Sequence, residues 1–408
     1  MRWLTAALSP LVLATIANTS PVQVHTSDID GHNETTTLVR RVRTGPSGEL
    51  LEPKTITDLF LLDDGPGGCI GQEEVLTDWL QESMQLHGAL ERLYANVAGD
   101  LAKAYLWLTW FGVQFRNGDI DFEDEENAQL WSNIGDHISR VSSFFAGRQL
   151  QDPQVSSESP RLFCGADAAT FQDWSASVVR DRDGNDVVWS EDPETGHVEY
   201  LGLGRAFGEM AGDLNARAFW FDAYNGYSIH FERQESVCQS NSNRLMYANT
   251  ARPMSSWPSS ALSPGVDFEF GRANRHIMLC PPSFNPSGGV HSYPSLARAV
   301  HEDTYPTADV RDPGEALTRM LPVSSTLYHE IYHLTDADNT PDRGYTINEI
   351  LLNARDEDFR LVNSHNPETF VNIAMAAFLY FYPPHPEDDD ERCVYLGHFP
   401  KSAASLFR

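Results

Sequence analysis

The sequence predicts an α+β fold that is mostly helical, with a small β-sheet and an inserted region of loops and hairpins. Residues 72–115 and 130–145 carry apolar side chains at the spacing of amphipathic helices. Residues 165–265 instead alternate short β-prone runs with turns rich in Gly, Ser, Asn and Pro. The 408 residues, 41% of them hydrophobic, are enough to build well-buried cores.

The first 20 residues have the pattern of a targeting segment. Arg2 supplies a positive start, a short apolar run follows, and Thr15 and Ala17 offer a small-x-small cleavage site. The run is too short to span a bilayer, and no later run reaches about 18 apolar residues. We therefore expect a signal peptide at 1–20, a secreted protein and no membrane partner.

The other elements are expected in this order along the chain. Residues 21–58 are polar and form a linker or short propeptide, and residues 59–382 form the main domain with an insertion at about 165–265. The acidic stretch 119–126 is expected to be a solvated loop, and so are residues 241–264. Hairpins are predicted around 181–189 and 196–200, a strand at 276–280, helices at 326–334, 346–362 and 367–380, and an acidic tail at 383–408.

The chain is strongly acidic. Its 29 Lys and Arg residues face 58 Asp and Glu residues, for a formal net charge of −29. This balance argues against nucleic acid and anionic membranes as partners, because both bind basic surfaces. It favours cationic ligands, although adaptation to acidic surroundings would produce the same composition. We expect a monomer that acts on protein or peptide substrates.

Five cysteines are present, at positions 69, 164, 238, 280 and 393. In an oxidising compartment they predict two disulfides and one unpaired cysteine. Their spacing does not choose among the fifteen ways of making two bonds. None of them has CxxC spacing, so a cysteine zinc site is not expected.

The stretch TLYHEIYHL, residues 326–334, contains the pattern HExxH. On a helix, His329 and His333 lie one turn apart on the same face and can bind one zinc ion. Glu330 would then sit beside the water at the open coordination position and act as general base. Leu327, Ile331 and Leu334 form an apolar stripe beside the histidines, as an active-site helix packed on a core would require. A pair of buried structural histidines would show the same stripe, and HExxH also occurs by chance in roughly a few per cent of chains of this length.

A catalytic zinc requires a third protein ligand, and several carboxylates follow the motif. Asp336 and Asp338 are near the end of the helix, Asp342 follows a Thr-Pro turn, and Glu349 lies on the next helix. Residue spacing alone leaves the choice between Asp342 and Glu349 open.

The motif and the residues after it resemble the deuterolysin-type metalloendopeptidases, the aspzincins. HExxH followed by GTxDxxYG is their pattern, and residues 339–346 of this chain read NTPDRGYT. Asp342 lies 342 − 333 = 9 residues after His333, as in the peptidyl-Lys members. Asn339 and Thr346 stand where the family has glycine. The resemblance is specific at 326–345 and fainter over 69–380.

The resemblance implies a zincin-like fold and a zinc-dependent endopeptidase with one Zn²⁺ per chain. By position, it implies that His329, His333 and Asp342 are the ligands, that Glu330 is the base and that Tyr345 stabilises the oxyanion. It also pairs Cys69 with Cys164 and Cys238 with Cys280. Glu368, in Asn366-Pro367-Glu368, corresponds to a segment that lines the S1′ pocket and would select a basic P1′ side chain. The competing interpretation of Glu368 is a first-turn helix glutamate.

Two rival functions remain open from the sequence. One is a secreted zinc-binding protein without proteolysis, which would act in metal capture or surface interaction and would need neither Glu330 nor Tyr345. The other is a non-enzymatic protein in which HExxH is accidental, and this rival predicts no bound metal.

Overall fold

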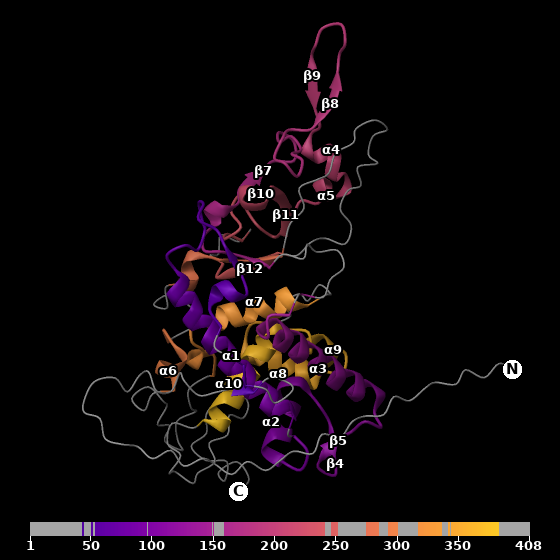
Figure 1. The fold of residues 1–408 in the computed structure, drawn as a ribbon. Helices are drawn as coiled ribbons and strands as arrows, with labels where there is room; N and C mark the ends of the chain where they lie inside the picture. The colour runs from indigo at the N-terminus through magenta and orange to yellow at the C-terminus, as the bar shows by residue number, and fades with distance from the viewer. Residues whose placement is uncertain are drawn as a thin grey trace, which may run out of the picture.

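The computed structural model describes residues 43–44, 50–51, 54–95, 97–148, 150, 159–240, 246–251, 275–284, 293–300, 317–336, 342 and 344–382. The expected signal peptide, most of the expected linker, Asp338 and the acidic tail with Cys393 lie outside these residues. Within them, the chain combines helices and sheets, so the predicted α+β class is confirmed (Figure 1).

Helices are the most abundant regular elements of the described residues, although they make up less than half of them. They are α1 (Glu73–Ala95), α2 (Leu101–Phe111), α3 (Glu125–Phe145), α4 (Leu203–Phe207), α5 (Glu209–Gly212), α6 (Leu296–Ala299), α7 (Ser325–Thr335), α8 (Ile347–Arg355), α9 (Arg360–Asn363) and α10 (Pro367–Phe381). The strands are β1 (Arg43–Thr44), β2 (Leu50–Leu51), β3 (Leu61–Leu62), β4 (Phe115–Arg116), β5 (Asp119–Ile120), β6 (Arg161–Phe163), β7 (Thr170–Gln172), β8 (Val188–Glu191), β9 (Val198–Tyr200), β10 (Ala216–Phe221), β11 (Gly226–Phe231), β12 (Ala248–Ala251) and β13 (His276–Leu279). None of the helices described is long and apolar enough to cross a membrane.

The large helices pack around one main hydrophobic core. α7 lies in its middle, against α1, α3 and α10, so almost every residue of α7 is buried. α2 packs against α8 and ends at Gly112, whose φ of 75° is left-handed. A Cβ at Gly112 would lie 2.1 Å from the backbone oxygen of Ala354, so glycine is required for this close approach.

A four-stranded sheet covers the other side of α7, with the order β12-β13-β6-β3. β13, β6 and β3 pair in parallel, and β12 pairs antiparallel with β13 at the edge of the sheet. β12 contacts α7 directly, and Figure 1 shows it just above this helix. The strand predicted at 276–280 is therefore confirmed as β13. The prediction that 241–264 is all loop was wrong for 248–251.

The insertion forms a folded unit with its own sheet and core, although only loops and hairpins were predicted there. It contains an antiparallel sheet of order β11-β10-β7 and a projecting β8–β9 hairpin (Figure 1). Its separate core includes Val179, Leu201, Trp220 and Tyr227. Short strands of three to six residues carry too little periodicity for this sheet to be visible in the sequence.

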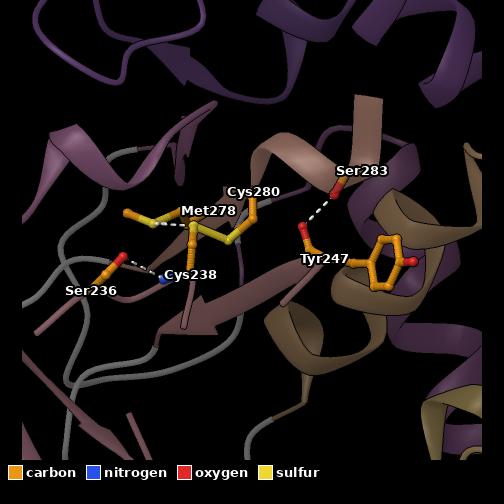
Figure 2. Close-up of a disulfide and its surroundings, with 6 residues drawn as sticks. All are labelled: Ser236, Cys238, Tyr247, Met278, Cys280 and Ser283. Atoms are coloured by element: carbon orange, nitrogen blue, oxygen red, sulfur yellow. Dashed lines mark hydrogen bonds between the residues drawn. A yellow bond between two sulfur atoms is a disulfide. The ribbon is translucent and has the colours of Figure 1, made fainter. Parts of the chain in front are cut away.

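Two disulfides tie the sheets to the rest of the fold. Cys69 pairs with Cys164, and Cys238 pairs with Cys280, as the family resemblance implied. Figure 2 shows the second bond between the segment after β11 and the end of β13, with Met278 beside it. It lies in a small core that joins the inserted sheet to the four-stranded sheet. Disulfides of this kind are typical of an oxidising compartment.

Two predicted boundaries differ from the structure. The acidic stretch 119–126 is only partly loop, because β5 occupies its start and α3 begins at Glu125. Asp124 caps that helix by accepting hydrogen bonds from the backbone of Glu126 and Asn127, so its acidity marks a helix start. The helix predicted at 346–362 is interrupted: α8 ends at Arg355, and the chain turns at Asp356 before α9. The helix predicted at 367–380 matches α10.

Candidate metal centre

The buried helix α7 presents both histidines of the motif on one face. The imidazole centroids of His329 and His333 are 5.0 Å apart, as an i, i+4 pair on a helix requires. The buried Arg275 donates a hydrogen bond from Nη1 to the backbone oxygen of Leu334 at 2.6 Å, near the C-terminal end of the helix. This bond satisfies a carbonyl that the helix itself leaves open.

Asp342 completes a three-residue group. Its Oδ1 lies 3.2 Å from His329 Nε2 and 3.1 Å from His333 Nε2. The donor atoms of these three residues all lie within 4.8 Å of one another. Two imidazole nitrogens and one carboxylate oxygen are the protein ligands of a catalytic zinc site with an open fourth position.

Glu349, the other candidate ligand from the sequence, instead caps the N-terminal end of α8. Its carboxylate accepts hydrogen bonds from the backbone of Thr346, and the Thr346 hydroxyl accepts from the backbone of Glu349. This is a capping box at the start of the helix. Asp336 caps the C-terminus of α7 and pairs with Arg140, outside the group formed by Asp342 and the histidines.

The electrostatics of the group favour a bound cation. Burial acts to lower the pKa of His329, but Asp342, Glu368 and Glu330 outweigh it and the net shift is upward. Burial acts to raise the pKa of Asp342, but the two histidines outweigh it and hold that pKa well below its usual range. The carboxylates thus place a negative field at the imidazole nitrogens, which a divalent cation would neutralise. The residues present therefore fit zinc.

Glu368 contacts the ring nitrogen of His329 that does not face Asp342. Its Oε2 accepts a hydrogen bond from His329 Nδ1 at 3.1 Å, and its Oε1 accepts one from Asn372 Nδ2 at 3.1 Å. A carboxylate on the second nitrogen of a histidine ligand fixes the tautomer and the orientation of the ring. Both oxygens of the buried Glu368 are thus engaged inside the protein, which favours orientation of His329 over contact with a substrate side chain.

Glu330 is buried next to the histidines and is held by a residue that the sequence reasoning missed. Thr250, on β12, donates a hydrogen bond from Oγ1 to Glu330 Oε2 at 2.6 Å. The same hydroxyl lies 3.2 Å from the backbone oxygen of Glu330. The edge strand therefore holds the carboxylate of the candidate base.

Tyr345 sits at the exposed side of the centre. Its ring stacks on that of His329 with a centroid distance of 6.4 Å and an interplanar angle of 13°. Its hydroxyl donates a hydrogen bond to Asp342 Oδ2, while 56% of the residue is exposed. Burial of the hydroxyl and the charge of Asp342 raise the pKa of Tyr345, so the hydroxyl keeps its proton at neutral pH.

Arg233, from the insertion, brings a positive charge toward the same centre. It follows β11 after Glu232, whose φ of 58° is left-handed and turns the chain. Burial lowers the pKa of Arg233, whereas Tyr345, Glu330 and Asp342 act in the opposite direction. Neither Arg233 nor Thr250 belongs to a sequence motif. Thr250 lies 325 − 250 = 75 residues before the start of α7 and Arg233 lies 325 − 233 = 92 residues before it, so no local signal could have found them.

Comparison with known proteins adds one partial match. A protein named non-secreted LysM effector LysM17, from Penicillium expansum, is 41% identical over 161 residues. The match covers 38% of this chain and 21% of the relative, so the chain spans about a fifth of that relative's length. The name describes the whole relative, and a match of this extent does not place the chain in a family. No known family and no solved structure matches the chain.

Proposed function

We propose that this chain is a zinc-dependent endopeptidase of the deuterolysin type, with a zincin-like fold and one zinc ion at the His329–His333–Asp342 centre. The observation that carries the proposal is the approach of both Nε2 atoms to one oxygen of Asp342, with Glu330 beside them. The resemblance of residues 326–345 to that family supports the same ligand set. A secreted protein with protein or peptide substrates is consistent with the two disulfides.

When bound, zinc would supply a Lewis acid that acidifies a water molecule and polarises the scissile carbonyl. Glu330 would accept the proton of that water and pass it to the leaving amine. Thr250 holds the Glu330 carboxylate in place for this transfer, and Glu368 holds the ring of His329. The Tyr345 hydroxyl, which now bonds to Asp342, would donate to the oxyanion that develops on the substrate.

The edge strand β12 offers a place for the substrate backbone. In the described sheet, β12 pairs only with β13, and Thr250 on β12 reaches Glu330. An extended peptide that adds to the other side of β12 would pass beside the candidate base. This arrangement suits an unfolded or extended segment of a protein substrate.

A zinc-binding protein without proteolysis is the main alternative. It accounts for the three ligands, but it gives no reason for a buried Glu330 held by Thr250 or for a Tyr345 hydroxyl at the exposed side of the centre.

The test uses the full chain, elemental analysis and a casein digest with and without chelator. The wild-type protein should cleave casein, and the chelator should abolish cleavage. Glu330→Gln should keep the zinc of this centre and lose turnover, because Glu330 is a base and not a ligand. His329→Ala should lose one equivalent of zinc. Normal cleavage by Glu330→Gln would exclude this mechanism, and metal binding without any cleavage by the wild-type protein would favour the alternative.

A further inference from the structure

A second group of metal-ligand side chains lies outside the centre described above. His137 on α3, Asp336 at the C-terminal end of α7 and His365 before α10 come from three separate elements. Their donor atoms lie within 4.8 Å of one another. The donor set, two imidazoles and one carboxylate, repeats that of His329, His333 and Asp342. We propose that His137, Asp336 and His365 form a second site for a divalent transition-metal ion such as Zn²⁺.

The two imidazoles already point their donor atoms at each other. His137 Nε2 lies 2.9 Å from His365 Nδ1, and the rings are nearly perpendicular, at 87°. Two nitrogen ligands of a tetrahedral zinc ion lie roughly 3.3 Å apart, given zinc–nitrogen bonds of about 2.0 Å. An ion in place of the shared hydrogen therefore requires the two nitrogens to separate by a few tenths of an ångström and the rings to tilt until both lone pairs point at the ion.

The surroundings suit neutral imidazole ligands. His137 is 5% exposed and Asp336 is 1% exposed. Burial of this kind disfavours the charged form of an imidazole, and the neutral form is the one that binds a metal ion. Asn133 lies 3.4 Å from His365 Nε2, the nitrogen that faces away from His137, and can orient that ring as an outer partner.

Arg140 carries a positive charge next to this group and would oppose a cation. Its Nη1 lies 2.8 Å from Asp336 Oδ1, and its side chain is 38% exposed. A carboxylate has two oxygens, so Asp336 can bind a metal ion with one and keep Arg140 on the other. Because it is partly exposed, Arg140 can also turn into solvent when an ion binds.

A metal ion at this second site would stabilise the elements that carry the residues proposed for catalysis. Asp336 directly follows the helix that carries His329 and His333, and His365 lies 368 − 365 = 3 residues before Glu368, which holds His329. An ion bound to Asp336 and His365 would join the end of α7 to the start of α10 and to α3. This inference does not depend on proteolysis, since the second group contains none of the residues proposed for catalysis.

The test counts metal in a chain that lacks the first centre. His329→Ala/His333→Ala, purified full length and dialysed against Co²⁺, should retain one equivalent of cobalt with the visible absorption of a low-coordinate site. Adding His365→Gln should remove that equivalent, because glutamine keeps the size and polarity of the side chain but does not bind as an imidazole does. Replacing the exposed His197 by glutamine is the matched control, and it should leave the count unchanged.

The outcomes separate the two proposals. No bound cobalt in the folded double variant, or full retention after His365→Gln, would show that the group is only a hydrogen-bonded cluster. If circular dichroism shows that a variant does not fold, the cobalt content of the wild-type chain is the test. It should be two equivalents if both groups bind an ion, and one if only the His329–His333–Asp342 centre does. The count does not depend on casein cleavage, so loss of the proposed protease activity would leave it unaffected.

Discussion

At the residue scale, Asp342 and Glu349 are two carboxylates with different roles. The carboxylate of Asp342 lies beside the Nε2 atoms of His329 and His333, whereas Glu349 caps α8. Asp342→Ala should weaken zinc binding by more than about a hundredfold, because even outer partners of a ligand are worth 10–100-fold. Glu349→Ala should leave the zinc content unchanged and lower the free energy of unfolding by about 0.5–2 kcal/mol. Zinc titration and urea unfolding of both variants measure these effects, and the reverse pattern would indicate that Glu349 is the ligand.

Thr250 is a positioning residue for the proposed base, because its hydroxyl is 2.6 Å from Glu330 Oε2. Thr250→Val keeps the shape of the side chain and removes this hydrogen bond. We expect kcat on a fluorogenic peptide to fall roughly tenfold to a hundredfold with KM nearly unchanged. Thr250→Ser is the matched control and should restore most of kcat. Equal losses in both variants, or a change in KM alone, would show that Thr250 only packs against α7.

The residues that the sequence could reveal are those that share one local stretch. His329 and His333 lie one turn apart on one helix with Glu330 next to His329, and Asp342 and Tyr345 follow within 12 residues of His333. For Glu368 the sequence predicts a contact with the substrate or a place in the first turn of a helix. Its contact with His329 is not predictable, because it depends on how α10 packs against α7. Thr250 reaches the centre only through sheet pairing, which no single-sequence pattern encodes.

A buried polar network joins α1, α3 and α7 at the scale of elements. His87 Nδ1 lies 3.0 Å from the Tyr328 hydroxyl, and His87 Nε2 lies 2.9 Å from Ser142 Oγ. The Ser142 hydroxyl in turn donates to Glu91. Burial raises the pKa of Glu91 from its ordinary value of 4.5 to about 7, although the bond from Ser142 opposes the shift.

This shift predicts a pH dependence of stability that Glu91→Gln should remove. Because the folded pKa is raised, the stability that protonated Glu91 contributes is present below about pH 4.5 and is lost as the pH rises toward 7. The free energy of unfolding of the wild type relative to Glu91→Gln should therefore fall over this window, by at most about 1.4 kcal/mol per pH unit.

Urea unfolding between pH 4 and 8 measures this difference. The buried His87 also titrates with a shifted pKa, but it is present in both proteins and largely cancels from the comparison. Glu194→Gln, which removes an exposed carboxylate between β8 and β9, is the control and should show the same fall with pH as the wild type. Parallel curves for wild type and Glu91→Gln would show that Glu91 is ionised in the folded protein.

Helices were predictable as elements because their apolar residues recur over three turns or more, as in α1, α3 and α10. The boundaries of the helices were harder to predict where an acidic residue acts as an N-cap, as Asp124 does before α3. The inserted sheet was missed because its pairings join strands separated by up to about 50 residues, and each strand is too short to show its own period.

At the scale of the whole molecule, three cores are held together at defined places. The Cys238–Cys280 bond and the small core around Phe163 and Phe221 join the inserted sheet to the sheet beside α7. The insertion is thus fixed close enough to supply Arg233 and the approach to β12. Together with Thr250, it makes the candidate metal centre a product of segments spread over more than 100 residues.

The net charge of −29 predicts how substrates approach this centre. Peptides with Lys at P1′ should be cleaved faster than matched peptides with Glu, and the ratio should decline as salt rises from 0.01 M to 0.1 M, where the screening length falls from about 30 to about 10 Å. Glu368→Gln at saturating zinc should keep this ratio, because Glu368 binds His329 and Asn372. Initial rates for the paired peptides at both salt concentrations measure the effect. A Lys preference that survives high salt and disappears in Glu368→Gln would instead place Glu368 in the S1′ pocket, as the family resemblance implied.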